Sequence, residues 1–227
     1  MRTWSGTGLY GKLPLRGDFV TRGLPFALVD GIDAWLVAGL DAARAILAEN
    51  WNDYYMSAPL WRFALPGGII GPAGVAGILL PSVDAGGRHF PLLSLIVADL
   101  PPPLLAAAAE GWYATAEELL RSVLAIDADM ARFDAGLAAL PDPMSISALS
   151  PPLRHGLAQW VLGATEGLWW TQGSPGLEPG LFIQEGLPRG GDFATLMGRP
   201  PPGSGGMRRL EPLALSTRGC ASNAPDA

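Results

Sequence analysis

The stretch GVAGILLP (Gly74–Pro81), followed after a short polar segment by FPLLSLIVA (Phe90–Ala98), decides the fold class of this chain. Both runs are apolar at almost every position, which is typical of strands that are covered on both faces. Aspartate and glycines gather at 84–88 between them, so the two runs form a candidate hairpin. The sequence therefore predicts a layered α/β fold whose sheet is mixed and not wholly parallel.

Elements are predicted on both sides of this hairpin from periodicity and from proline and glycine punctuation. We expect helices at 25–50, 104–125, 128–140 and 151–162. We expect further strands at 10–12, 60–65, 167–171 and 181–183. A length of 227 residues is most simply one domain, although two would also fit. The folded domain is expected over 1–199, with a Pro/Gly-rich and partly mobile tail over 200–227.

The composition limits the classes of partner and compartment. A formal net charge of −6 and a pI near 4.8 argue against a nucleic-acid partner and against binding to an anionic membrane. The single cysteine, Cys220, excludes an internal disulfide framework and fits a reducing compartment. No signal-peptide pattern opens the sequence, and the apolar stretch 91–109 is broken by Asp99 and by three prolines. We expect a soluble, cytoplasmic protein with no membrane insertion.

The segment GLYGKLPLRGDFV (Gly8–Val20) combines glycine, proline and charge with large apolar residues. Three glycines indicate backbone positions where a Cβ would clash or where a positive φ is needed. The segment also holds Lys12, the only lysine of the chain. No Gly-Lys-Ser/Thr run follows, so a phosphate loop is excluded. Lys12, Arg16 and Asp18 are therefore candidates for a protein contact or for internal ion pairs.

A catalytic centre is suggested most strongly by Ser82, Asp84 and His89, which could meet across the predicted turn. A serine nucleophile needs a base within hydrogen-bond reach and a group that orients this base. The strand-to-helix motif G-x-S-x-G is missing, however. The simpler interpretation is that Ser82 and Asp84 stabilise the turn by hydrogen bonds to the backbone, with Arg88 paired to Asp84. We favour this interpretation and predict no enzyme; a hydrolase built on these three residues is the alternative.

Cofactor and ligand sites find little support. His89 and His155 are the only histidines and neither belongs to a spaced His/Cys cluster, so no metal is expected. A dinucleotide fingerprint is also missing, so no cofactor is expected. A small-molecule-sensing module is a further alternative, which would show a closed apolar pocket. Trp51 and the pair Tyr54-Tyr55 follow the first long helix; they could form a protein-binding hot spot or fold back onto the core.

Several blocks of the chain resemble, in order, the TagF (ImpM) proteins associated with bacterial type VI secretion systems. The densest blocks are YGKLP (10–14), RGDF (16–19), RGLP (22–25), SAPLWRF (57–63), GILLPSVD (77–84) and GRHFPL (87–92). Later blocks are WWT (169–171) and GLP (186–188) with Phe193. The resemblance spans about 7–197, with 104–160 similar only in helical character.

The resemblance implies an αβα sandwich and a regulatory role without catalysis. Members of the family act as post-translational repressors of type VI secretion, and some bind a forkhead-associated scaffold protein. Others are fused to a phosphatase domain, for which this chain has no room. We hypothesise that the loop 12–22 and the turn 84–89 form the contact surface, because rigid glycine and proline backbone lowers the ordering cost of binding. Its candidate residues are Lys12, Arg16, Asp18, Arg22, Asp84, Arg88 and His89.

Overall fold

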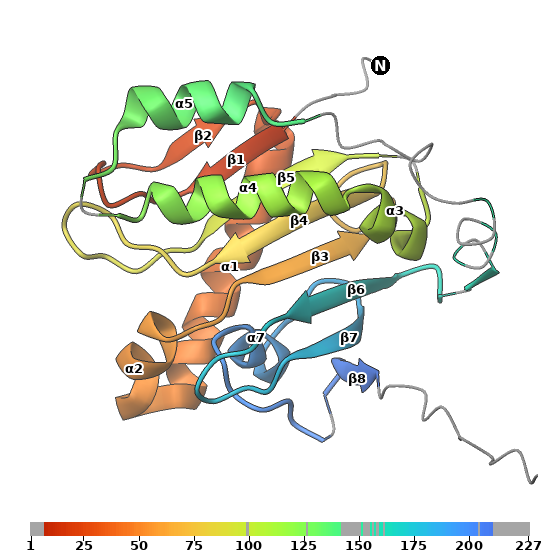
Figure 1. Ribbon diagram of the computed structural model, residues 1–227. Helices are drawn as coiled ribbons and strands as arrows, with labels where there is room; N and C mark the ends of the chain where they lie inside the picture. Colours follow the sequence, from red (N-terminus) through yellow and green to blue (C-terminus); the bar gives the residue numbers. More distant parts are fainter. Residues whose placement is uncertain are drawn as a thin grey trace, which may run out of the picture.

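The computed structural model describes residues 7–141 and 151–210, apart from 99, 126, 152–154, 156, 158, 161 and 204. Eight strands form one sheet in the order β2-β1-β5-β4-β3-β6-β7-β8 (Figure 1). Their bounds are β1 (Thr7–Gly11), β2 (Val20–Arg22), β3 (Trp61–Leu65), β4 (Val75–Leu80), β5 (Leu92–Val97), β6 (Glu166–Thr171), β7 (Gly180–Glu185) and β8 (Arg208–Leu210).

Helices cover both faces of this sheet (Figure 1). One face carries α1 (Phe26–Leu47), α2 (Trp51–Met56) and α7 (Gly191–Leu196), with the short 3-10 turn η1 (Ala48–Asn50) between α1 and α2. The other face carries α3 (Pro102–Ala108), α4 (Glu110–Ser122) and α5 (Met130–Ala138). The described residues thus form a three-layer αβα arrangement around a single sheet.

The apolar character of the strands follows from this double cover. Successive side chains of a strand point to opposite faces, so a strand between two helical layers buries every position. In β3, Phe63 and Leu65 belong to the core under α1, whereas Ala64 between them belongs to the core under α4. In β4, Val75 and Ala76 divide in the same way. All six residues of β4 are buried.

The hairpin predicted from 74–98 is confirmed. β4 and β5 pair antiparallel with Val75 opposite Val97 and Leu80 opposite Leu92. The expected layered α/β class is confirmed as well, but the prediction of a mixed sheet is wrong: all seven strand pairings are antiparallel. Apolar runs resemble parallel strands because double burial, and not strand direction, removes the polar alternation.

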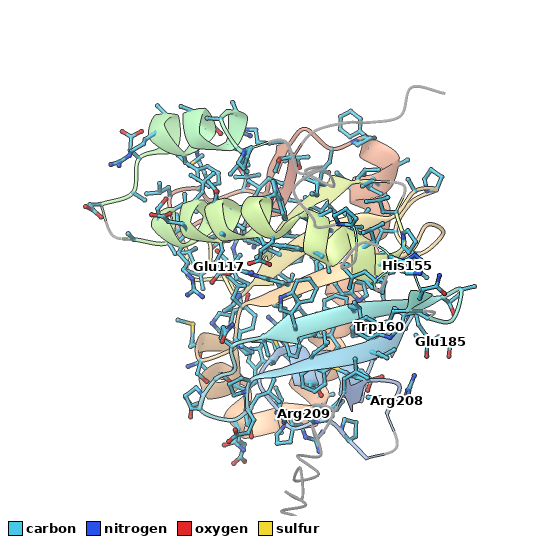
Figure 2. The ribbon with its side chains drawn as sticks, turned by 45° about the vertical axis from the view of Figure 1, so that its right-hand side comes forward. Glu117, His155, Trp160, Glu185, Arg208 and Arg209 are labelled. Carbon is cyan, nitrogen blue, oxygen red and sulfur yellow. The ribbon has the colours of Figure 1, made fainter. Side chains whose placement is uncertain are left out.

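Several short elements were missed in the sequence. The polar run 50–53 suggests a loop, but residues 51–56 form α2, and the sequence predicts neither α7 nor the edge strands β2 and β8. β8 pairs with β7, and Met207 just before it is buried, so part of the region after residue 199 packs onto the sheet. Figure 2 shows Arg208 and Arg209 on this edge strand. The helix predicted at 151–162 lies largely outside the described residues.

Candidate functional site

The carboxylate of Asp84 joins the turn 84–89 to the loop 12–22. Its Oδ2 accepts from Lys12 Nζ at 2.9 Å and from Arg88 Nε at 2.6 Å. Its Oδ1 accepts from the backbone N–H groups of Gly86 and Arg88, both at 2.9 Å. The Asp84 side chain is fully buried and that of Lys12 is 9% exposed, whereas that of Arg88 is 66% exposed. Asp84 is thus a buried anion with a complete set of donors.

This environment favours the charged form of Asp84. The hydrogen-bonded Lys12 ammonium is the largest cause, and it holds the pKa of the Asp84 carboxyl well below its usual range. Burial acts in the opposite direction, and the donors from Arg88 and Gly86 add to the effect of Lys12. A buried charge pair needs such additional hydrogen bonds, because both ions have lost their hydration. The backbone N–H groups of the turn therefore help Lys12 to stabilise the buried carboxylate of Asp84.

Backbone and hydroxyl groups join the same two segments at further points. The Ala85 N–H donates to the carbonyl of Arg16 at 2.9 Å, and Arg88 Nη2 donates to the carbonyl of Gly17 at 2.6 Å. Ser82 Oγ donates to the carbonyl of Lys12 at 2.7 Å. The loop and the turn are consequently one rigid unit.

A glycine at the end of β1 and a cluster of aromatic rings pack against the loop 12–22. Gly11, at the end of β1, has a φ of 140°, and a Cβ there would meet the carbonyl oxygen of Pro91, so only glycine fits. Phe19 stacks on Tyr10 with ring centroids 5.6 Å apart and meets Phe90 edge-on at 4.7 Å. Lys12 Nζ lies 5.0 Å from the Phe19 ring centroid. Phe19 itself remains 47% exposed.

The predicted contact residues divide into two groups. Lys12 and Asp84 are buried and form an ion pair with each other, so they stabilise the fold. Arg16 and Asp18 are exposed, and among the described residues neither takes part in an ion pair. The side chain of Arg88 is also mostly exposed, although its Nε contacts Asp84. The structure thus brings the loop and the turn together, but leaves only part of the predicted set accessible.

Arg22 has a different partner from the rest of the set. Its Nε lies 3.0 Å from Asp134 Oδ1 and its Nη2 lies 3.3 Å from Asp134 Oδ2. The two side chains are 39% and 42% exposed. This two-point contact ties β2 to α5, so Arg22 stabilises the edge of the sheet and the helix above it.

His89 packs against the aromatic residues that follow α1. Its ring centroid lies 4.5 Å from that of Tyr55 and 6.1 Å from that of Trp51. Burial, followed by the positive charge of Arg44, lowers the pKa of His89. The Tyr55 hydroxyl donates to the carbonyl of Ser82 at 2.7 Å and is fully buried. Tyr55 therefore folds back onto the core and is not available as part of a protein-binding hot spot.

Sequence reasoning missed the contribution of Arg44 and Trp51 to this region. The Arg44 guanidinium lies over the Trp51 ring at 5.1 Å, and Trp51 lies 5.1 Å from Tyr55. The spacing of Trp51 and Tyr55 by four residues was the available signal, because residues at i and i+4 share one face of a helix. It was overlooked because asparagines at 50 and 52 suggested a loop.

The hydrolase arrangement is not assembled. Ser82 Oγ donates to the Lys12 carbonyl, and both oxygens of Asp84 accept from Lys12, Gly86 and Arg88. His89 packs against aromatic rings. A serine nucleophile needs its base, and the base needs its orienting carboxylate, within hydrogen-bond reach. Ser82 and Asp84 are thus engaged in hydrogen bonds to the backbone and, for Asp84, in the pair with Arg88, as the simpler interpretation predicts.

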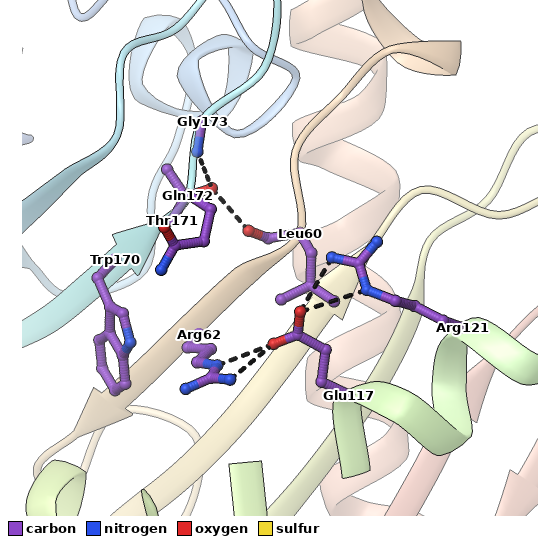
Figure 3. A pocket seen from close by; sticks show the side chains of 8 residues that line it. All are labelled: Leu60, Arg62, Glu117, Arg121, Trp170, Thr171, Gln172 and Gly173. Carbon is purple, nitrogen blue, oxygen red and sulfur yellow. Dashed lines mark hydrogen bonds and ion pairs between the residues drawn. The ribbon is translucent and has the colours of Figure 1, made fainter. Parts of the chain in front are cut away.

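A second polar cluster lies between β3, α4 and β6 (Figure 3). Arg62 contacts Glu117 at 2.8 Å and Glu110 at 3.1 Å, and Glu117 also accepts from Arg121 at 2.9 Å. Arg62, Glu117 and Arg121 line, together with Trp170, a hollow of about 40 Å³, which is room for roughly one or two water molecules. Because each guanidinium already faces a carboxylate, this cluster connects α4 to the sheet and offers little to a ligand.

Among the described residues, no three or more His, Cys, Asp or Glu side chains are grouped so that they could hold a metal ion. In the same part of the chain, no helix combines the length and the apolarity that crossing a membrane requires.

Comparison with known proteins identifies relatives. Residues 8–140 match the family model described as "TagF N-terminal domain, Type VI secretion system-associated". The crystal structure of PA0076 from Pseudomonas aeruginosa PAO1 is similar, with a TM-score of 0.73 and 34% sequence identity over 85% of this chain and 94% of that chain. A search of curated proteins finds no match. The family match includes both the loop 12–22 and the turn 84–89.

Proposed function

Because the chain belongs to the TagF family of type VI secretion system-associated proteins, we propose that it is a post-translational negative regulator of such a system that acts by binding another protein. Its partner would be a forkhead-associated scaffold component, as the family resemblance implies, and it would carry out no catalytic step. Its site of action would be the cytoplasm.

One observation supports binding over catalysis. The charged residues of the loop and the turn hold these two segments together, and the same arrangement presents Arg16, Asp18 and Arg88 outward on a fixed backbone. A pre-ordered surface loses little conformational entropy when it binds, so it suits recognition of a partner. We propose that these three residues, with the edge of His89 and the Phe19 ring, form the contact surface, and that Lys12, Asp84 and Arg22 maintain it.

The test is co-purification of forkhead-associated and other type VI scaffold components with the wild-type chain and with the double variant Arg16→Glu/Asp18→Lys. This variant leaves the net charge unchanged and touches no ion pair of the described residues. We expect it to recover at least tenfold less partner. Arg132→Glu, at an exposed position of α5 outside the proposed contact surface, is the control and should behave like wild type.

Two outcomes would count against the proposal. Equal recovery by wild type and the double variant would exclude this surface. Failure of every scaffold component to co-purify with the wild-type chain would exclude the proposed mode of action. A secretion assay in cells that lack or overproduce the chain would test repression directly.

A further inference from the structure

The helices α3, α4 and α5 do not cover their face of the sheet evenly. Among the described residues, the buried core on this face draws on β1, β3, β4 and β5 and includes no buried residue of β6 or β7. Over β6 and β7 lies instead a groove of about 560 Å³. Its lining is mostly apolar: α3 supplies Ala106 and Ala107, and the two strands supply Leu168, Trp170 and Leu181.

Large apolar side chains in this groove are open to solvent. Trp160, which also lines it, is 38% exposed (Figure 2), and Trp170 and Leu181 are only partly buried. A contiguous exposed apolar surface commonly marks the place where another segment binds. The volume lies within the range of roughly 300–1,000 Å³ that is typical of binding sites. The groove therefore has the size and the character of a binding site for an apolar segment.

The strand register places Leu210, the last described residue, at the edge of this groove. Leu210 of β8 pairs with Leu181 of β7, which in turn pairs with Trp170 of β6. Directly paired residues of antiparallel strands share one face of the sheet, so these three side chains form a row that leads into the groove. Two strand spacings, or about 10 Å, separate Leu210 from Trp170.

The sequence that follows Leu210 suits this groove. It is Glu211-Pro212-Leu213-Ala214-Leu215, and the two leucines are the only large apolar residues of 211–227. Three extended residues span about 10 Å, so a chain that continues from Leu210 can bring Leu213 over Trp170. In an extended segment, Leu213 and Leu215 point to the same side. Both leucines can therefore enter the groove together.

We propose that residues 211–215 of the same chain bind in this groove, with Leu213 and Leu215 packed against Trp170 and against Ala106 of α3. The segment crosses β7 and β6 and extends the apolar cover of this face toward the edge of the sheet. Because β8 tethers it beside the groove, binding is intramolecular, and a short tether gives an effective concentration in the millimolar range. A few apolar contacts therefore suffice. This inference is independent of the proposed regulatory function.

The test is the reactivity of a cysteine placed in the groove of the full chain. Ala106→Cys in a Cys220→Ser background puts a single thiol on the groove wall, because Cys220 is the only native cysteine. Adding Leu213→Asp/Leu215→Asp should raise the rate of maleimide labelling of this thiol at least tenfold, since carboxylates are not stable in an apolar groove. Circular dichroism verifies that each variant is folded.

Two controls are matched to the leucine variant. Ser216→Asp/Thr217→Asp adds the same two charges to the chain just beyond the proposed contact and should leave the labelling rate of Ala106→Cys unchanged. Ala45→Cys is at an exposed position of α1, on the opposite face of the sheet, and should label at the same rate with and without the leucine substitutions. An unchanged rate for Ala106→Cys in the leucine variant would overturn the proposal.

A second measurement shows which chain supplies the segment. In the Cys220→Ser background, Ala106→Cys/Leu213→Cys should form a disulfide within one chain on mild oxidation, whereas Ala45→Cys/Leu213→Cys should not. Mass spectrometry of the oxidised protein distinguishes a bridge within a chain from a bridge between chains. Bridges only between two chains would overturn the proposal, because a second copy would then supply the segment. A bridge that forms no faster than in the Ala45→Cys control would overturn it as well.

Discussion

At the scale of single residues, Asp84 determines how the loop 12–22 meets the turn 84–89. It accepts four hydrogen bonds: from Lys12 Nζ, from the backbone N–H and the Nε of Arg88, and from the backbone N–H of Gly86. Their burial differs sharply, because Lys12 is enclosed while the Arg88 side chain is mostly in water. Equal charges at similar distances should therefore differ in their contribution to stability.

Lys12→Met should lower the free energy of unfolding by about 3 kcal/mol, because it leaves the buried Asp84 carboxylate with only one cationic partner. Arg88→Ala should lower it by less than about 1 kcal/mol, because an exposed ion pair is screened by solvent. Urea denaturation at pH 7 followed by circular dichroism gives both values. A larger loss for Arg88→Ala than for Lys12→Met would contradict this ranking.

The lowered pKa of Asp84 also predicts how stability changes in acid. In the unfolded chain this carboxyl takes up a proton near its ordinary pKa of about 3.9, whereas in the folded chain it resists protonation. Its contribution is therefore complete above that pKa and is lost as the pH falls toward the folded-state value. Urea midpoints measured from pH 7 to pH 2 should decline less steeply for Asp84→Asn than for wild type. Parallel curves would show that other carboxylates dominate the acid transition.

At the scale of elements, the packing of α1 on α7 depends on a glycine. Gly39 faces the sheet side of α1, and a Cβ there would overlap the ring of Phe193. At Gly31, eight residues earlier in the same helix, an added Cβ would meet no atom within 4 Å. The two positions are thus equivalent in helix propensity and opposite in packing.

Gly39→Ala should destabilise the protein by about 1–3 kcal/mol, because the overlap outweighs the better helix propensity of alanine. Gly31→Ala should stabilise it by about 0.5–1 kcal/mol, because only the propensity changes. Thermal or urea unfolding of the two variants provides the comparison. A stabilising Gly39→Ala would mean that the Phe193 ring moves aside at little cost.

At the scale of the whole molecule, the sheet is protected at its centre and open at its ends. β4, β5 and β3 have a strand on each side and a helical layer over each face. β2 and β8 are three residues long and stand at the two edges. Short edge strands restrict pairing with other chains, but they also open first.

Amide hydrogen exchange should follow this order. We expect the slowest exchange in β3, β4 and β5, approaching the global unfolding free energy, and the fastest in β8 and β2. Mass spectrometry of peptic fragments resolves these segments. Protection of β8 equal to that of β4 would indicate that a further element or a partner covers this edge.

The sequence by itself determined the layered α/β class, the 74–98 hairpin and the long helix from Phe26, because apolar periodicity and turn residues are local signals. It also pointed to the loop 12–22 and the turn 84–89 as a pair of signature blocks. Only the tertiary structure decided that every strand pairing is antiparallel and that Lys12 and Asp84 are buried while Arg16 and Asp18 are not. Strand direction and burial depend on which segments meet across the sheet, and contacts such as Lys12–Asp84, 72 residues apart, leave no trace in local spacing.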